Sequence, residues 1–328
     1  MPPYFSIVVP MYNRERFIAR AINSYLKQDF DDYEIIVIDD GSTDKSVDVV
    51  KGYTDPRIKL ICHSVNRGVG PARNTGVDAA TGEWVVRIDS DDELLPGALS
   101  IIYRRSIEVG ENIFRMNFMA QVDTGGFSPD PPLKNEFWDY ITYIQWAERC
   151  YGSRRGDTVN VIRRVTFEKI RFNYDRTLEF LYNLEFMKQF HAWSFSDVVA
   201  LGHQDAENRL SNPSMSCIIE GAQDQVLSGE LLLKNHGEAL KVYAPQTYRS
   251  QILGLATLCF ISGNRLKGIK YSLSSLESNF LSLRNWAILL VGVLGPKPLA
   301  WLKSIDRSPL KRPTPVVPLN PSQSRVDP

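Results

Sequence analysis

Cysteine is scarce in this sequence. Only four of the 328 residues are cysteine, and they lie far apart with no C-x-x-C pair. This spacing argues against a disulfide framework and against a structural zinc site, and it favours a reducing compartment. The N-terminal segment MPPYFSIVVP also lacks the basic leader and the roughly 7- to 15-residue apolar core of a secretory signal. We therefore expect a cytoplasmic protein.

Glycine-rich phosphate loops and nucleophile elbows are missing too. The turn after the first apolar run reads PMYNRE, without the glycines of a G-x-G-x-x-G dinucleotide fingerprint, and no G-x-x-x-x-G-K-[ST] loop occurs. No G-x-S-x-G motif is present, and the four histidines have no evident nucleophile partner. Dinucleotide binding and serine hydrolysis are therefore disfavoured. Any phosphate would have to be held by a metal ion and side chains.

The sequence has no net charge, because 38 lysine and arginine residues balance 38 aspartate and glutamate residues. The chain as a whole lacks the basic footprint of a nucleic-acid-binding protein, so no nucleic-acid partner is expected. The balance is uneven along the chain, since residues 1–244 hold 27 basic and 35 acidic side chains, whereas residues 245–312 hold 10 basic and 2 acidic ones.

Apolar runs long enough to cross a membrane are absent as well. The runs at residues 251–261 and 286–294 fall well short of the roughly 20 residues that a spanning helix needs. Two interpretations remain for this part of the chain. It forms helices that pack on the rest of the protein or on each other, or the basic residues 245–312 contact an anionic membrane surface, which would make the protein peripheral on the cytoplasmic face.

Apolar runs that suit strands alternate with segments of helical periodicity in the first 110 residues. The predicted strands are residues 5–10, 33–40, 57–63 and 83–89, and the predicted helices are residues 15–28, 43–53, 71–80 and 96–109. Such alternation favours right-handed βαβ crossovers. It predicts an α/β fold with a mainly parallel sheet covered by helices.

After residue 110 the pattern is weaker. We predict strands at residues 112–122, 158–164 and 193–202, a helix at 178–190 and a loop or flap at 123–135. Strand signals vanish from residue 221, and helices broken near Gly263 and Gly295–Pro296 follow. The predicted organisation is an α/β domain over residues 1–220, a helical region over 221–305, and a disordered tail with six prolines over 306–328.

Polar side chains follow three of the predicted strands where they end. Asn13 follows the first strand, Asp40 and Ser42 follow the second, and the acidic run 89–92 follows the fourth. A single acid at such a place is often a helix N-cap or a solvated turn. Because the carboxyl ends of parallel strands meet at one edge, three coincident ends favour a ligand site. Three acids in four residues need a compensating cation, and hard oxygen ligands suit Mg²⁺ or Mn²⁺.

The loop NRGVGPARN at residues 66–74 supplies positive charge beside these acids. Pro71 is placed to begin a helix, so Arg73 falls in its first turn. A guanidinium at a helix N-terminus favours anions. The alternative is an arginine that faces solvent.

The segments VVPMYN, VIDDGSTD, NRGVGPARNTG and RIDSDDELLP, in this order and spacing, resemble the family 2 glycosyltransferases, which have the GT-A fold. The resemblance covers roughly residues 4–110 closely and continues more loosely to about 216. It implies a GT-A fold with a Rossmann-like nucleotide-binding half, and a C-terminal helical extension. It further implies inverting transfer of one sugar from a nucleotide diphosphate donor, with a UDP-sugar as the first expectation, to a hydroxyl of a glycan, polysaccharide or lipid-linked acceptor.

The resemblance also assigns residues to the donor. It implies a nucleotide-binding pocket formed by Pro10, Tyr12, Asn13, Asp40, Ser42 and Arg73, with Asp40 hydrogen-bonded to the base. Asp89-Ser90-Asp91 matches the D-x-D motif of the family. In that motif Asp91 would contact Mn²⁺ or Mg²⁺ directly, and Asp89 would face the ribose or the metal shell.

The sequence departs from the family at the catalytic base. A Glu-Asp pair common in the family aligns with Tyr182-Asn183, and an asparagine cannot accept the acceptor proton at neutral pH. Glu179, four residues earlier on the predicted helix, and Glu185 are the substitutes that the sequence offers.

A second departure concerns a histidine. Ser211 stands where the family has a histidine two residues after an arginine, here Arg209, and His203 is the nearest substitute. Two further hypotheses therefore stand beside an active transferase. One is a nucleotide-sugar-binding paralogue without the usual base, and the other is a nucleotidyltransferase.

Overall fold

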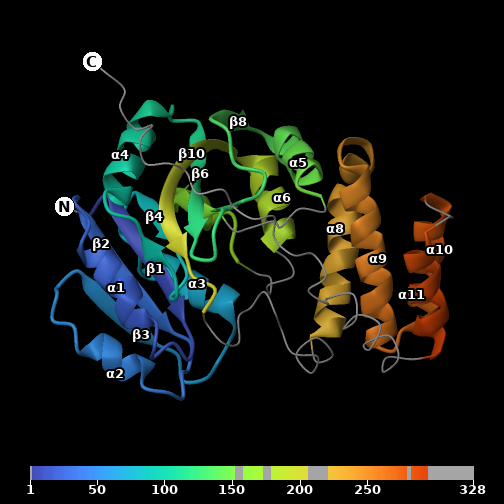
Figure 1. Ribbon diagram of the computed structural model, residues 1–328, viewed down its shortest axis with the longest axis horizontal. Coiled ribbons are helices and arrows are strands. Elements are labelled where there is room, and N and C mark those ends of the chain that lie inside the picture. Colours follow the sequence, from blue (N-terminus) through green and yellow to red (C-terminus); the bar gives the residue numbers. More distant parts are fainter. Residues whose placement is uncertain (1, 152–157, 173–178, 206–220, 279–281, 295–328) are drawn as a thin grey trace.

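The computed structural model describes residues 2–151, 158–172, 179–205, 221–278 and 282–294 (Figure 1). A single ten-stranded sheet forms its centre. The strands are β1 (Phe5–Met11), β2 (Tyr33–Asp39), β3 (Ile58–Cys62), β4 (Trp84–Arg87), β5 (Glu93–Leu94), β6 (Ile113–Val122), β7 (Phe127–Ser128), β8 (Glu136–Trp138), β9 (Val159–Arg163) and β10 (His191–Gly202).

The sheet is parallel in its N-terminal half and mixed beyond it. Its strand order is β3-β2-β1-β4-β9-β6-β10-β5, with β7 paired to β6 and β8 paired to β10. Strands β1 to β4 run parallel, as the alternating pattern predicts. β9 runs antiparallel to both β4 and β6, whereas β6 and β10 are parallel to each other. The predicted α/β fold is therefore confirmed.

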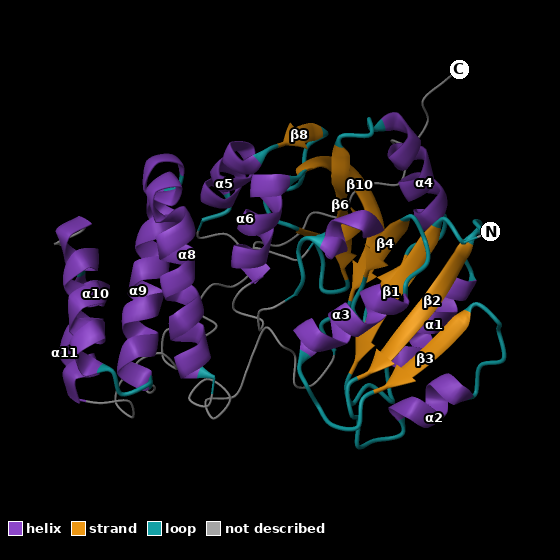
Figure 2. Cartoon of the chain, turned by 180° about the vertical axis from the view of Figure 1, so that it is seen from behind, coloured by secondary structure: helices purple, strands orange, loops and turns teal. Residues whose placement is uncertain are grey.

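Helices cover both faces of this sheet (Figure 2). One face packs against α1 (Ile18–Leu26), α2 (Ser46–Lys51) and α4 (Ala98–Glu108), and the other against α3 (Val69–Ala79), α5 (Tyr140–Arg149) and α6 (Glu179–Gln189). Side chains alternate between the two faces along a strand. In β1, accordingly, Ile7 and Val9 contact the first set of helices and Val8 contacts the second.

Helix α3 lies unusually close to the sheet. A Cβ atom at Gly76 would come 2.6 Å from Cδ1 of Ile38, so only glycine fits at this crossing. The close approach places the start of α3, with Arg73, beside the ends of β1, β2 and β4. The N-terminus of α3 therefore lies at the carboxyl edge of the sheet, where the sequence predicts a ligand site.

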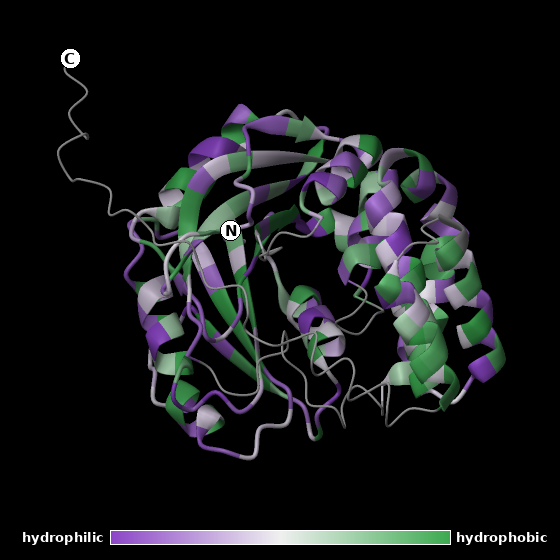
Figure 3. Cartoon of the chain, turned by 45° about the vertical axis from the view of Figure 1, so that its right-hand side comes forward, coloured by the Kyte–Doolittle hydropathy of each residue, from purple (hydrophilic) through white to green (hydrophobic). Residues whose placement is uncertain are grey.

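A block of helices follows the sheet. It contains α8 (Ala222–Tyr243), α9 (Pro245–Ile261), α10 (Arg265–Ser278) and α11 (Leu283–Leu294), and α8 and α9 pack against α5 (Figures 1 and 3). The expected break near Gly263 is confirmed, because α9 ends at Ile261 and Gly263 has a φ of +81°. Within the described ranges, no helix is both long and apolar enough to span a bilayer. The expected break at Gly295–Pro296 and the tail 306–328 lie outside the described residues.

The sequence did not predict α5 or β8, which together occupy Glu136–Arg149. Asp139 caps α5, since its side chain accepts a hydrogen bond from the backbone N–H of Thr142. The boundary between the α/β part and the helices, placed at residue 220, falls in a stretch outside the described residues and stays a prediction.

A buried carboxylate joins the first three strands to the turn before β4. The Oε1 atom of Glu34, on β2, accepts hydrogen bonds from Ser6 Oγ and Thr81 N, both at 2.7 Å. Its Oε2 atom lies 2.6 Å from Nζ of Lys59 on β3. Burial acts to raise the pKa of Glu34, but the hydrogen bonds from Lys59 and Ser6 outweigh it and lower the pKa from 4.5 to about 2.

We expect Glu34→Gln to destabilise the protein by about 1–3 kcal/mol at neutral pH, because it removes a buried, charge-assisted set of hydrogen bonds. A depressed pKa in the folded state means that the carboxylate stabilises the fold above pH 4.5 and that this contribution is lost as the pH falls toward about 2. The difference in the free energy of unfolding between wild type and Glu34→Gln, measured by urea unfolding, should therefore narrow as the pH falls from 4.5 toward about 2. Glu111→Gln, at an exposed site, is the control. If its free energy of unfolding differed from that of wild type with the same pH dependence, the stabilising role given to Glu34 would be contradicted.

Candidate functional site

The loops after β1 and β2 are locked together at the carboxyl edge of the sheet. Asn13 has a φ of 51°, an uncommon value for a residue other than glycine. Its backbone N–H donates to Ser42 Oγ at 2.9 Å, and its side-chain Oδ1 accepts from the backbone N–H of Thr43 at 2.8 Å. Tyr12 beside it remains exposed, whereas Pro10 is half-buried within β1. The structure therefore brings Asn13 and Ser42 together beside Tyr12, and their role in nucleotide binding stays a prediction.

Asp40 is buried, and its carboxylate holds the loop that precedes α3. Oδ1 accepts from the backbone N–H of Arg67 at 3.0 Å, and Oδ2 accepts from that of Gly68 at 2.8 Å. Nδ1 of His63 lies 2.7 Å from Oδ1, and Nε2 of the same ring lies 2.9 Å from Thr75 Oγ1. These contacts give Asp40 a structural role, and its contact with a nucleotide base stays a prediction. His63, at the end of β3, is an anchor that sequence reasoning missed.

The D-x-D motif follows β4, and an arginine faces each of its carboxylates. Arg73 Nη2 lies 3.4 Å from Oδ1 of Asp89, whose side chain is 44% exposed. Arg14 Nε lies 3.7 Å from Oδ2 of Asp91, which is largely buried, as is Ser90. The acids are thus held at the strand ends with their charge partly balanced. Two carboxylates of this kind fit a hard divalent cation such as Mg²⁺ or Mn²⁺.

Arg14 connects the acidic motif to the loop after β1. Its Nη1 atom donates to the carbonyl oxygens of Tyr12, at 3.2 Å, and Asn13, at 3.1 Å. Its backbone N–H donates to Ser46 Oγ at 2.7 Å. One side chain therefore links the predicted nucleotide-base loop to Asp91. Sequence reasoning did not single out Arg14, although it comes directly after Asn13.

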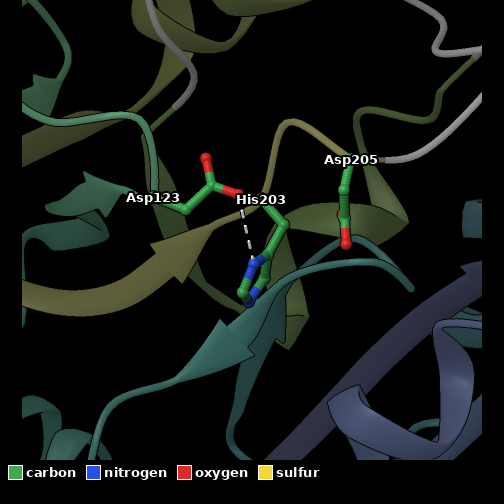
Figure 4. Close-up of side chains that lie close together, drawn as sticks. All are labelled: Asp123, His203 and Asp205. Carbon is green, nitrogen blue, oxygen red and sulfur yellow. Dashed lines mark ion pairs between the residues drawn. The ribbon is translucent and has the colours of Figure 1, made fainter.

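A second group of possible metal ligands lies nearby, at the ends of β6 and β10. One ligand atom each from Asp123, His203 and Asp205 falls within 4.8 Å of the others (Figure 4). The histidine ring is already paired, since Nε2 lies 2.6 Å from Glu93 and Nδ1 lies 3.4 Å from Asp123. Asp205 is paired with Arg20 at 2.9 Å. An ion could enter here only by replacing these pairs.

Arg20, on α1, joins this second group to the D-x-D motif. Its Nη2 atom donates to the backbone carbonyl of Asp91 at 3.0 Å and to Asp205 at 3.2 Å. The backbone N–H of His203 in turn donates to Asp92 Oδ1 at 3.0 Å. His203, considered above as a substitute for the missing histidine, therefore belongs to the support of the acidic loop.

Glu179, the first residue of α6, is the base candidate that faces the site. Its Oε1 atom lies 2.9 Å from Arg87 Nη2, and its side chain is 36% exposed. Burial acts to raise the pKa of Glu179, but the positive charges of Arg87 and Arg73 outweigh it and lower the pKa to about 2. Glu179 is therefore ionised, and Arg73 lies within electrostatic reach of both Glu179 and Asp89.

Glu185, the other candidate base, is engaged with the C-terminal helices, and its role as the base stays a prediction that its contacts do not favour. Its carboxylate accepts hydrogen bonds from Asn235 at 2.8 Å and lies 2.9 Å from Nε2 of buried His236. The other ring nitrogen of His236 lies 2.8 Å from the hydroxyl of Tyr140. Both His236 and Asn235 belong to α8, so this side chain is committed to the contact between α6 and the C-terminal helices.

Asn183 lies one turn beyond Glu179 and faces the interior. Its Oδ1 atom accepts a 2.7 Å hydrogen bond from Arg115, whose side chain is almost fully buried on β6. Asn183 is therefore engaged with Arg115, and its alignment with the family's usual base position stays a prediction. Arg209 and Ser211 lie outside the described residues.

The comparisons with known proteins agree with this geometry. The family model for glycosyl transferase family 2 matches residues 6–179. The GalNAc(5)-diNAcBac-PP-undecaprenol beta-1,3-glucosyltransferase of Campylobacter jejuni is 41% identical over 210 residues, which cover 62% of this chain and 67% of that protein. The succinoglycan biosynthesis protein ExoO of Rhizobium meliloti is 40% identical over 111 residues, 34% of this chain and 32% of that protein.

Solved structures share the fold. S. aureus TarS in complex with UDP-GlcNAc has a TM-score of 0.58 at 18% identity, and the match covers 94% of this chain and 92% of that one. The mannosyltransferase PcManGT from Pyrobaculum calidifontis, in complex with GDP-Man and Mn²⁺, has a TM-score of 0.52 at 18% identity over 93% of this chain and 84% of that one. From the sheet, the strand-end motifs and the family match together it follows that this chain belongs to glycosyl transferase family 2 and is a glycosyltransferase.

Proposed function

We propose that this glycosyltransferase moves one hexosyl residue from a nucleoside diphosphate sugar to an acceptor hydroxyl, with inversion and with the help of a divalent cation. The observation that carries the proposal is the convergence of Asp89, Arg73 and Glu179, which come from three different parts of the fold. An acid that suits a metal ion, a cation that suits a phosphate and an ionised carboxylate share one edge of the sheet.

The donor is proposed to bind over the interlocked loops after β1 and β2. The exposed ring of Tyr12 offers a surface for the nucleotide base, and the Asn13–Ser42 contact fixes the loop that carries it. Relatives of this fold have been solved with UDP, UDP-GlcNAc and GDP-Man. We propose a UDP-sugar as the first donor to test and a GDP-sugar as the second.

The diphosphate is proposed to lie between the D-x-D motif and Arg73. Asp89 and Asp91 would hold Mn²⁺ or Mg²⁺, with water and phosphate oxygens completing its shell. When bound, such an ion neutralises the charge that develops on the departing diphosphate. Arg73 is the fifth residue of α3, which begins at Val69 and not at Pro71 as the sequence predicted, and it adds a second positive charge near the same group. The N-terminus of α3 also favours anions.

Glu179 is proposed to take the proton from the attacking acceptor hydroxyl. Its Oε1 atom is held by Arg87, so Oε2 is the oxygen left to accept the proton. Arg87 is therefore a positioning residue, because it fixes the carboxylate and keeps it ionised. The same positive charge lowers the basicity of Glu179, which is why a weakly active or binding-only protein remains the alternative to be tested.

Glu179→Gln should lower kcat about 100- to 10,000-fold, the usual contribution of a general base, because the amide cannot accept the proton. Donor binding should change little. Transfer and donor hydrolysis would be measured with UDP-sugars and Mn²⁺. Glu185→Gln, on the same helix but turned to α8, is the matched control and should keep near wild-type kcat. Equal losses in both variants would show that Glu179 acts only on the stability of α6.

The two acidic groups can be told apart by their effect on metal-dependent donor binding. Donor with Mn²⁺ should raise Tm, since a ligand of the native state stabilises it, and a chelator should abolish the rise. We expect Asp91→Asn to lose the Mn²⁺-dependent part of this shift and Asp123→Asn to keep it. The reverse result would move the ion to the group of Asp123, His203 and Asp205.

Asn183→Asp separates the active enzyme from the binding-only alternative. In the structure the new carboxylate would meet buried Arg115 and not the acceptor, so we expect stability to rise by about 1 kcal/mol and kcat to stay unchanged. A large gain in kcat would instead support a paralogue that has lost its base at this position.

The acceptor is proposed to be a glycan, a polysaccharide or a lipid-linked saccharide handled in the cytoplasm. The Campylobacter jejuni relative is a glucosyltransferase named for an undecaprenol-linked saccharide, and the Rhizobium meliloti relative is a succinoglycan biosynthesis protein. Release of nucleoside diphosphate during turnover would fit sugar transfer. Release of inorganic pyrophosphate would indicate the nucleotidyltransferase alternative.

A further inference from the structure

The last two described helices expose large apolar side chains. Leu266 and Leu273 on α10, and Leu283, Leu290 and Leu294 on α11, are between 49% and 86% exposed. Leu266 and Leu273 are seven residues apart, as are Leu283 and Leu290, with Leu294 four further on. Residues at such spacings share one face of a helix. Each helix therefore carries a leucine stripe on its exposed side.

The inward sides of the same helices combine small and polar residues with apolar ones, among them the buried Leu276 and Ile288. Gly268, Ser272 and Ser275 of α10 are buried, and so are Asn285 and Gly292 of α11. Nδ2 of Asn285 donates to Ser275 Oγ at 2.8 Å across the pair. A helix that covers a core normally buries its apolar face and exposes its polar face. α10 and α11 follow this order only in part, because they bury some apolar side chains but leave their leucine stripes exposed.

Phe260 of α9 fixes the orientation of both helices. A Cβ atom at Gly268 would come 2.7 Å from its ring, and one at Gly292 would overlap the ring. The glycine faces therefore have to point at α9, and the leucine stripes cannot turn inward. Figure 3 shows that hydrophobic stretches run through this helical block. Because a packing contact keeps the leucines outside, their exposure calls for a partner.

Basic residues outnumber acidic ones in and near these stripes. Residues 245–294 contain five basic side chains, Arg249, Arg265, Lys267, Lys270 and Arg284, and a single acidic one, Glu277. Lys267 is bound to Glu230 of α8. Arg265 and Lys270 are exposed, and Lys270 lies four residues after Leu266 and three before Leu273, on the same side of α10. Leucines interleaved with lysine and arginine match an interface between acyl chains and anionic headgroups.

We propose that the leucine faces of α10 and α11 bind the surface of an anionic lipid bilayer, with both helices lying in the plane of the interface. α10 spans Arg265–Ser278 and α11 spans Leu283–Leu294, too short to cross a bilayer. The leucines would enter the boundary of the acyl region, while Arg265 and Lys270 would meet phosphate groups. The proposal goes beyond the transfer reaction and does not depend on it.

The test is sedimentation of the full chain with vesicles of phosphatidylcholine alone or mixed with phosphatidylglycerol. We expect binding to the anionic vesicles that weakens at high salt, and little binding to the neutral ones. Leu290→Glu and Leu266→Glu should each lower the partition coefficient about tenfold or more, because they put a carboxylate into the interface. Lys270→Glu, which keeps the leucines, should weaken binding to the anionic vesicles alone.

Leu227→Glu is the matched control, since Leu227 is 59% exposed on α8, away from both stripes, and its binding should equal that of wild type. If the Tm and the rise in Tm caused by the donor are the same as in wild type, the variant is folded. Absence of vesicle binding, or binding that survives all three variants, would overturn the proposal. Light scattering that shows a dimer dispersed by Leu290→Glu, without vesicle binding, would overturn it in favour of a contact between two copies. Neither outcome would change sugar transfer to a soluble acceptor, so the membrane proposal and the proposed transfer reaction can fail independently.

Discussion

The pairing of acids with arginines at the carboxyl edge of the sheet is the constraint on which the site depends. Carboxylates gathered at a few strand ends repel one another, and burial strengthens that repulsion. Each acid is matched by an arginine from another element: Asp91 by Arg14, Asp205 by Arg20, Asp89 by Arg73 and Glu179 by Arg87. The loop after β1, helices α1 and α3, and strand β4 are thereby held in one arrangement.

The sequence predicted the N-terminal half of the fold well, because the signals there are local. Runs such as YEIIVID are buried on both sides, and they alternate with helices, two of which, α3 and α4, begin directly after a glycine. The prediction failed at α5, although Asp139 and Thr142 have the spacing of a helix cap. Aromatic residues dominate that segment, and their spacing suits a strand as well as a helix. Only the packing of Tyr143 and Ile144 under the sheet decides between the two.

The choice of base shows where sequence reasoning stops. Glu179, Asn183 and Glu185 lie within two turns of one helix, so spacing alone leaves all three near a site. The structure separates them through partners that are distant in the sequence: Arg87 for Glu179, Arg115 for Asn183 and His236 for Glu185. These pairs are 92, 68 and 51 residues apart. Such contacts depend on the strand order around β9, which no local pattern records.

The contact of Phe260 with Gly268 and Gly292 decides which substitutions the C-terminal helices tolerate. Because the ring sets the orientation of α10 and α11 from the inside, substitutions on the leucine side leave the packing of the block intact. The inner side of these helices therefore determines the stability of the block, and the outer side determines the chemistry of its surface. Relatives can exchange the outer residues to suit a different surface without a new fold. The inner glycines, in contrast, admit no larger side chain without forcing the helices away from α9.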